Sequence, residues 1–144
     1  MMKRKEKKIL VVDDDDRHLH LAREVLESEG YLVHTHASGF GVTGIVQSFR
    51  PDLLLLDITL PGLPGDDLAA FLLADDRTRH VPIVFYSSLD ETSVISSTVR
   101  RRVRGYIRKG DIEELRSKVR YFLHNHCPQA MNEAFSRSRL YAVE

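Results

Sequence analysis

The chain has 144 residues, of which 42% are hydrophobic and 29% charged, with a formal net charge of +0. This length predicts one globular domain with a sizeable core, and the even charge excludes a global field that favours nucleic acid or a membrane surface. The one cysteine, Cys127, excludes an internal disulfide, and no apolar run approaches the roughly 18 residues that span a bilayer, so we expect a cytoplasmic protein.

Short apolar runs alternate along the chain with segments of helical spacing. The runs are residues 9–12, 31–33, 53–56, 81–86 and 106–107, and the helical segments are residues 21–26, 42–49, 68–72, 90–99 and 112–122. This alternation predicts an α/β domain with a five-stranded parallel sheet. The uninterrupted runs at 9–12 and 53–56 indicate central strands that are covered on both faces.

The domain organisation follows from these limits. We expect a basic N-terminal segment over residues 1–7, the α/β domain over residues 8–126 and a C-terminal extension over residues 127–144. The role of the extension is left open, as is the question of whether the chain is part of a longer protein.

Polar residues gather where the expected strands end. They are Asp13 to Asp16 after the first strand, Asp57 after the third, Ser87 after the fourth, and Arg108 with Lys109 after the fifth. The carboxyl ends of parallel strands share one edge of the sheet, where ligands bind. With strand order 2-1-3-4-5, Asp13, Asp14 and Asp57 converge there, with Ser87 and Lys109 opposite. Asp15 and Asp16 are better explained as helix-start residues.

Three converging carboxylates need a positive partner, because each pair at about 4 Å costs roughly 4 kcal/mol at an effective dielectric constant near 20. Mg²⁺ is the natural ligand, with Mn²⁺ as an alternative, and the backbone carbonyl of Thr59 is a candidate further ligand. Lys109 adds a fixed positive charge, and the Ser87 hydroxyl can donate to an anionic oxygen. A carboxylate nucleophile in this setting predicts formation of an aspartyl phosphate on Asp57.

Four stretches in order, ILVVDDD, LLLLDITLPGLPG, PIVFYSS and GYIRKGD, resemble the receiver domain of two-component response regulators. The resemblance covers roughly residues 7–126 and implies a flavodoxin-like (βα)5 fold, similar to a single-domain chemotaxis regulator. It implies that Asp57 is the phosphoacceptor, that Asp13 and Asp14 hold the metal, and that Ser87 and Lys109 assist. Ser87 and Tyr106 are then the switch residues.

The resemblance also implies partners and limits. A histidine kinase or histidine phosphotransfer protein is the expected donor, and an unknown downstream protein reads the surface of the fourth helix, fifth strand and fifth helix. No membrane contact and no direct DNA binding are expected, and a homodimer is left open. We expect no enzyme activity beyond the chain's own phosphotransfer and slow autodephosphorylation. Thr59 and Leu89 stand at the positions that tune attack by water, and Leu89 predicts slow loss of phosphate.

Two departures from the family pattern stand out. Gly110 follows Lys109 where the family usually has a cis proline, which leaves the isomer of that peptide bond open. The segment RRRVR, residues 100–104, replaces a small-residue pair before the fifth strand. A solvated face is its simplest explanation, and docking of an acidic partner or nucleic acid is the alternative.

Three other interpretations were weighed against this one. A phosphatase that uses an aspartyl phosphate needs a second acid two residues after the nucleophile, where this chain has Thr59. A phosphate-independent interaction module is disfavoured by the full set of Asp, Ser and Lys residues. Zinc binding by the histidines is disfavoured because His34 and His36, for example, lack helical i, i+4 spacing.

Overall fold

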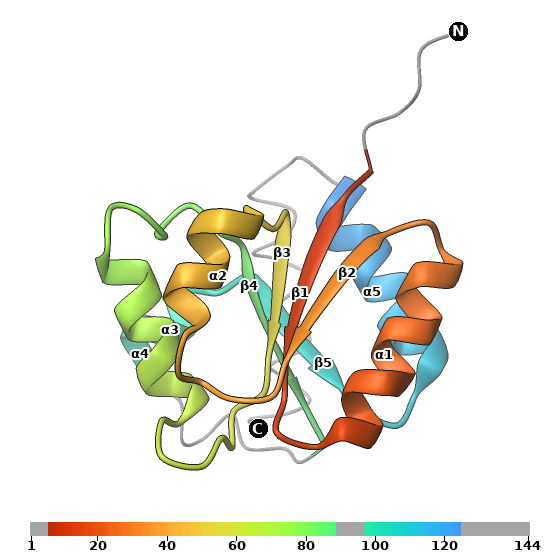
Figure 1. Ribbon diagram of the computed structural model, residues 1–144, viewed down its shortest axis with the longest axis horizontal. Helices are drawn as coiled ribbons and strands as arrows, with labels where there is room; N and C mark the ends of the chain where they lie inside the picture. The colour runs from red at the N-terminus through yellow and green to blue at the C-terminus, as the bar shows by residue number, and fades with distance from the viewer. Residues whose placement is uncertain (1–5, 89–96, 125–144) are drawn as a thin grey trace, which may run out of the picture.

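The computed structural model describes residues 6–88 and 97–124. Its strands are β1 (Lys8–Val12), β2 (Leu32–His36), β3 (Leu53–Leu56), β4 (Ile83–Ser87) and β5 (Gly105–Arg108). All pair in parallel, in the order β2-β1-β3-β4-β5 (Figure 1). The expected α/β fold and strand order are therefore confirmed.

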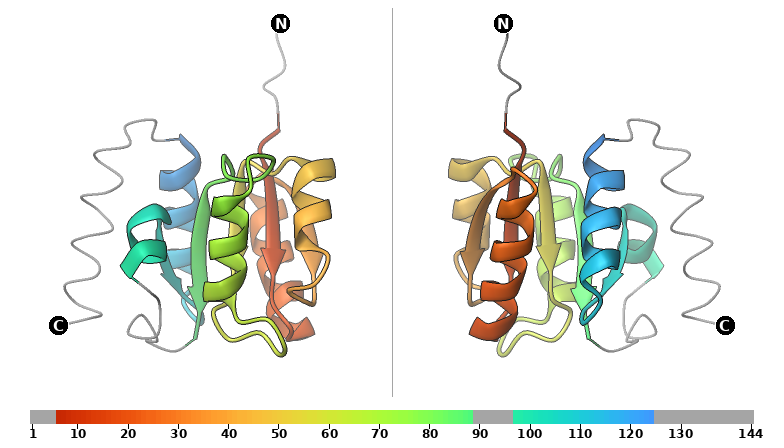
Figure 2. Two further views of the ribbon diagram at one scale, coloured as in Figure 1. Left: turned by 90° about the vertical axis from the view of Figure 1, so that its left-hand side faces the viewer. Right: turned by 90° about the vertical axis from the view of Figure 1, so that its right-hand side faces the viewer.

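The helices cover both faces of this sheet. They are α1 (Asp16–Ser28), α2 (Val42–Phe49), α3 (Gly65–Ala74), α4 (Ser97–Arg102) and α5 (Ile112–His124). Helices α1 and α5 pack on one face, and α2, α3 and α4 lie on the other (Figures 1 and 2). This two-sided cover is the doubly wound arrangement that short β-α-β connections produce.

The four leucines of β3 show why this strand is so apolar. Leu53 and Leu55 belong to the core beneath α1 and α5, whereas Leu54 and Leu56 belong to the core beneath α2, α3 and α4. All four are 0% exposed. Each buried leucine stabilises the fold by about 1.5–3 kcal/mol, so β3 is a rigid central support for the residue that follows it.

Strand β2 is longer than its sequence suggests. The expected run ended at residue 33, but the strand continues through His34, Thr35 and His36. It is an edge strand, paired only with β1, and these three side chains are only partly buried. An edge strand with one open side tolerates polar residues, and for that reason the apolar run failed to predict its end.

The helix start predicted at Asp15 and Asp16 is confirmed. Asp15 caps α1, with its side chain accepting a hydrogen bond from the backbone N–H of Arg17 at 2.9 Å, and Asp16 lies in the first turn. The Arg17 guanidinium also binds this carboxylate and holds the pKa of Asp15 far below its usual range. At α5, Asp111 accepts from the N–H of Glu114 at 3.0 Å.

Part of the arginine cluster has a structural role. Helix α4 continues to Arg102, whereas the sequence placed the helical segment at residues 90–99. The Arg102 guanidinium donates to the carbonyl of Leu73, near the end of α3, at 2.9 Å. Arg102 is exposed, as expected for a solvated face, and its guanidinium in addition satisfies a carbonyl at a helix C-terminus.

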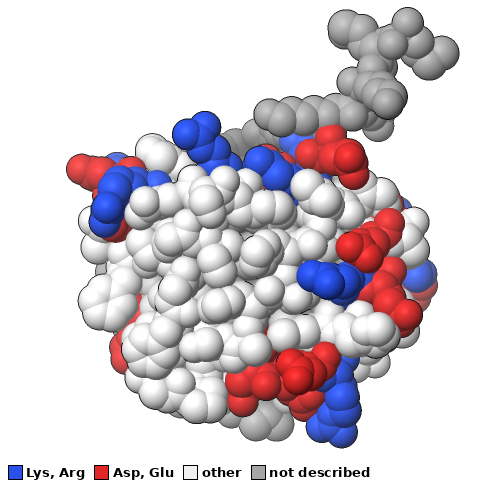
Figure 3. All heavy atoms as spheres, viewed as in Figure 1, with Lys and Arg blue, Asp and Glu red and all other residues white. Residues whose placement is uncertain are grey.

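The surface view places charged side chains mainly at the rim of one face. Acidic atoms gather at its lower edge, where the carboxyl ends of the strands lie (Figure 3).

Among the described helices, none has the length and apolar character to cross a membrane.

Candidate functional site

Backbone hydrogen bonds continue past the strand ends and position the site. Asp57 directly follows β3, and its N–H donates to the carbonyl of Val12 on β1 at 3.0 Å. Asp13 directly follows β1, and its N–H donates to the carbonyl of His36 at 3.1 Å. The two aspartates are thus held side by side by the same ladder that forms the sheet.

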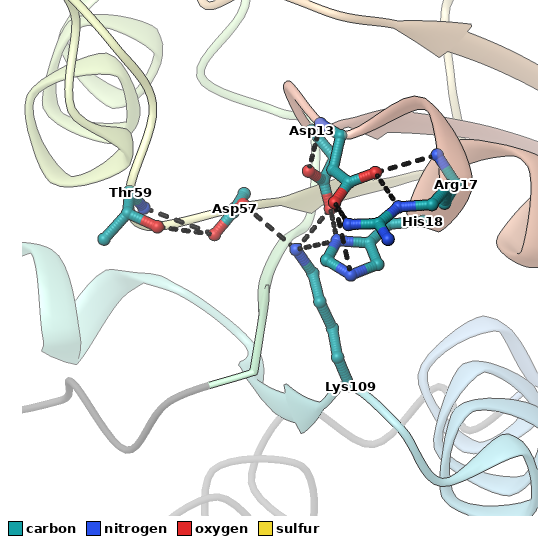
Figure 4. A network of polar contacts seen from close by, with 7 residues as sticks. Asp13, Arg17, His18, Asp57, Thr59 and Lys109 are labelled. Carbon is teal, nitrogen blue, oxygen red and sulfur yellow. Dashed lines mark hydrogen bonds and ion pairs between the residues drawn. The ribbon is translucent and has the colours of Figure 1, made fainter.

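Lys109 reaches this pair from the end of β5. Its N–H donates to the carbonyl of Ser87 at 2.9 Å, and its ammonium donates to Asp57 Oδ2 at 3.0 Å and forms an ion pair with Asp13 Oδ2 (Figure 4). All three side chains are buried: Lys109 is 5% exposed, Asp13 is 1% exposed and Asp57 is 6% exposed. A buried charge is tolerated only when it is paired, so each of these groups depends on the others.

Asp14 completes an acidic group at the pocket. One carboxylate oxygen from each of Asp13, Asp14 and Asp57 lies within 4.8 Å of the others. Three ionised carboxylates beside one ammonium leave a local excess of negative charge. Oxygen donors at this spacing suit a hard divalent cation such as Mg²⁺, so the residues present fit such an ion. In residues 6–88 and 97–124 this is the one such group of carboxylates, histidines or cysteines, and the histidines form none.

The segment after β3 shapes the mouth of the pocket. The N–H of Thr59 donates to Asp57 Oδ1 at 3.2 Å and its hydroxyl donates to the same oxygen at 3.4 Å, which fixes the Asp57 carboxylate. A hollow of about 540 Å³ opens beside it, lined by Asp14, Thr59, Asp66, Asp67 and neighbouring apolar residues. Thr59 is exposed, and its role as a carbonyl ligand stays a prediction.

Ser87 and Tyr106 lie on the two strands beyond β3. Ser87 ends β4 and is 2% exposed, and Tyr106, on β5, is 7% exposed within the core beneath α2, α3 and α4. Tyr106 therefore packs inward, a position that suits both the switch role and a plain core role. The second tuning position, Leu89, lies outside the described residues.

Two residues at the pocket were missed by the sequence analysis. His18, in the first turn of α1, places Nδ1 3.2 Å from Asp13 Oδ2 and 3.2 Å from the Lys109 ammonium (Figure 4). Tyr86 lies beneath, with its ring centroid 5.5 Å from that ammonium. Burial, and then the nearby Asp13 charge, raise the pKa of Tyr86 to about 12. The start of a helix directly after Asp13 was the available signal for His18.

The backbone after Lys109 determines the isomer of the Lys109–Gly110 peptide bond. None of the described peptide bonds is cis, and Gly110 has φ +97, a left-handed conformation that glycine adopts without a steric penalty. The Lys109–Gly110 bond is therefore trans, which answers the question that the sequence left open.

An open parallel α/β sheet with a lysine-paired acidic pocket at its carboxyl edge defines a class of proteins that can carry an aspartyl phosphate. The profile of the response regulator receiver domain family matches residues 9–120, and the chain belongs to this family. It is a receiver domain of two-component signalling, a family in which phosphorylation and magnesium binding are typical.

Individual relatives agree with this assignment. The chain is 32% identical over 78 residues to the polar-differentiation response regulator DivK of Brucella anthropi, a match that covers 54% of this chain. It spans 63% of that relative, less than two thirds of its length. A CheY-like receiver domain protein of Methanospirillum hungatei JF-1 is similar at 25% identity and a TM-score of 0.73, covering 90% of this chain and 99% of that one.

A further solved structure has the same fold. It is the receiver domain of a sensor histidine kinase from Pseudomonas aeruginosa PAO1, with 23% identity, a TM-score of 0.72 and coverage of 83% of this chain and 98% of that one. That protein has a magnesium ion coordinated in its active site cleft.

Proposed function

We propose that this chain accepts a phosphoryl group on Asp57 from a phosphohistidine of a kinase or phosphotransfer protein. A carboxylate oxygen of Asp57 forms the new bond to phosphorus, and the bond from phosphorus to the histidine nitrogen breaks with its electron pair going to that nitrogen, so that the leaving imidazole takes up a proton from solvent. The supporting observation is the placement of the Lys109 ammonium between Asp13 and Asp57, within a pocket of carboxylate oxygens.

Each side chain has a distinct task in this reaction. The ladder contact to Val12 and the donors of Thr59 fix the direction of the Asp57 carboxylate. Lys109 offsets charge on the incoming phosphoryl oxygens, and the Ser87 hydroxyl is expected to donate to one of them in the phosphorylated state. Asp13 and Asp14 would hold Mg²⁺, which neutralises phosphoryl charge when bound. We infer that the chain performs only this self-phosphorylation, with no turnover of an external substrate.

The expected output is a change of surface. An acyl phosphate adds roughly two negative charges to the pocket, and the proposed response is a movement of Ser87 toward it with Tyr106 filling the vacated space. The surface of α4, β5 and α5 then binds a downstream protein in the cytoplasm. NMR spectra with Mg²⁺ and beryllofluoride should shift signals along these three elements, and an unchanged spectrum contradicts the proposal.

The primary test is labelling by a small phosphodonor, such as phosphoramidate, with Mg²⁺. The parent chain should gain one phosphoryl group that hydroxylamine removes, and the Asp57→Asn variant should gain none. Asp76→Asn is the matched control, because Asp76 is exposed and forms an ion pair with Arg79 at 3.1 Å. Equal labelling of Asp57→Asn and the control would refute the assignment.

The lifetime of the phosphate is a separate expectation. Leu89 has no polar group to orient an attacking water, and Thr59 offers only a hydroxyl. We therefore expect slow loss of phosphate in the purified phosphorylated chain. A half-life of only seconds without a phosphatase is the outcome that contradicts this.

A further inference from the structure

The Lys109 ammonium has three acceptors around it. An ammonium carries three N–H donors and no acceptor. Asp57 Oδ2 lies 3.0 Å away, His18 Nδ1 lies 3.2 Å away, and Asp13 Oδ2 forms the third contact (Figure 4). The number of acceptors therefore matches the number of donors, and one of the three is a nitrogen from a residue outside the acidic group.

Two tautomers of the neutral His18 ring are compatible with these contacts, because Nδ1 lies 3.2 Å from both Asp13 Oδ2 and the Lys109 ammonium. If Nδ1 accepts from Lys109, the proton belongs on Nε2, which faces Asp15 Oδ2 at 3.8 Å. Asp15 is itself held as the cap of α1 and paired with Arg17. The opposite tautomer would donate from Nδ1 to Asp13 Oδ2, 3.2 Å away, and would deprive Lys109 of its third acceptor.

The His18 contact differs from the other two in one respect. Asp13 and Asp57 both supply oxygens to the group that fits a divalent cation, whereas His18 does not belong to that group. Of these three acceptors of Lys109, the imidazole is therefore the one that would not also serve as a ligand of a divalent cation.

We propose that His18 is a positioning residue, which holds the Lys109 ammonium through Nδ1 at a site where Asp13 and Asp57 would also serve as cation ligands. This inference rests on the proposed function of Asp57 as phosphoacceptor. Without the imidazole, the long lysine side chain keeps fewer acceptors when the cation binds and spreads over more conformations. Lys109 is then less often in place to meet the incoming phosphoryl group.

Two variants distinguish the effect of losing the hydrogen-bond acceptor from the effect of losing the volume of the ring. His18→Leu keeps apolar bulk without an acceptor, and His18→Asn restores an acceptor, the amide oxygen, near the place of Nδ1. We expect His18→Leu to lower the rate of phosphorylation by a small phosphodonor about three- to tenfold, since one hydrogen bond is lost at a site that water partly reaches. His18→Asn should recover the rate to within about twofold of the parent. Circular dichroism verifies the fold of both.

A second readout is independent of phosphorylation. In the metal-free parent at alkaline pH, nitrogen NMR of the neutral imidazole should report the tautomer with the proton on Nε2. Proton exchange of the Lys109 ammonium should be faster in His18→Leu than in the parent or in His18→Asn. This readout stands even if Asp57 takes no label, so failure of the proposed function and failure of the His18 role are distinguishable.

Three results would overturn the inference. A proton on Nδ1 in the parent would exclude the acceptor role. A His18→Leu chain that phosphorylates at the parent rate, or a His18→Asn chain that is no faster than His18→Leu, would show that Lys109 is held without the imidazole.

Discussion

Gly65 joins the start of α3 to the backbone that carries Asp57. Its N–H donates to the carbonyl of Ile58 at 2.8 Å, and it is buried. A methyl group at this position would lie 2.1 Å from the carbonyl oxygen of Asp57 and 2.8 Å from the Cα of Ile58. Both obstacles are backbone atoms, so no rotation of a side chain can relieve the contact.

The Gly65→Ala substitution should therefore be costly. To reach 3.0 Å, the shortest contact that real Cβ atoms make, α3 and the Asp57 backbone must separate by about 0.9 Å. Overpacking of this kind typically costs 1–3 kcal/mol, and with rigid backbone on both sides we expect about 3 kcal/mol. For a chain of this size the loss corresponds to a fall of about 10 °C in the midpoint of thermal unfolding. The same shift displaces the Asp57 carboxylate and should weaken Mg²⁺ binding.

Urea unfolding followed by circular dichroism measures the first effect, and calorimetric Mg²⁺ titration measures the second. Gly44→Ala is the matched control, because Gly44 lies within α2 with nothing within 4 Å of an added Cβ. It should stabilise the chain by about 0.5–1 kcal/mol through helix propensity and leave Mg²⁺ binding unchanged. A Gly65→Ala chain within 1 kcal/mol of the parent would refute the steric argument.

Three further predictions concern charge. Lys109→Met leaves the carboxylates of Asp13 and Asp57, 1% and 6% exposed, without their cation; we expect a loss of about 3–5 kcal/mol that Mg²⁺ partly restores. Urea unfolding with and without Mg²⁺ tests this, and an equal response of parent and variant to the metal contradicts it. Asp15→Ala removes the cap of α1 and should cost about 1 kcal/mol, whereas Asp15→Asn keeps the acceptor and should cost a few tenths; equal losses in the same assay would argue against the cap. The folded pKa of Tyr86, about 12, exceeds its ordinary 10.0. The stability that the neutral Tyr86 phenol contributes to the fold is therefore complete below pH 10 and is lost as pH rises toward 12. Tyr86→Phe should flatten this part of the stability profile, and an unchanged slope there disproves the effect.

Continuous apolar runs made the centre of the sheet predictable. The predicted run 53–56 coincides with β3, and the run 9–12 falls one residue short of β1, because both strands are buried on two faces. At the edges the signal weakens. β2 ends in the partly buried His34 to His36, and β5 extends from Gly105 to Arg108, beyond its two apolar residues.

The sequence predicts those site residues whose place depends only on strand order. Asp13, Asp14, Asp57 and Lys109 each follow a strand, so strand order alone brings them to one edge. His18 depends on where α1 begins and on how its first turn faces the pocket, which no strand pattern encodes. The contact of Arg102 with the end of α3 likewise depends on helix packing rather than on local sequence.

The backbone hydrogen bonds of Asp13, Asp57 and Lys109 have a consequence for the dynamics of the pocket. These residues stand formally in loops, yet their amides are tied to neighbouring strands and should exchange with solvent as slowly as core amides. The reactive atoms thus move with the sheet rather than with the loops around them. The sheet therefore sets the spacing of these backbones, while the loop residue Thr59 sets the direction of the Asp57 carboxylate.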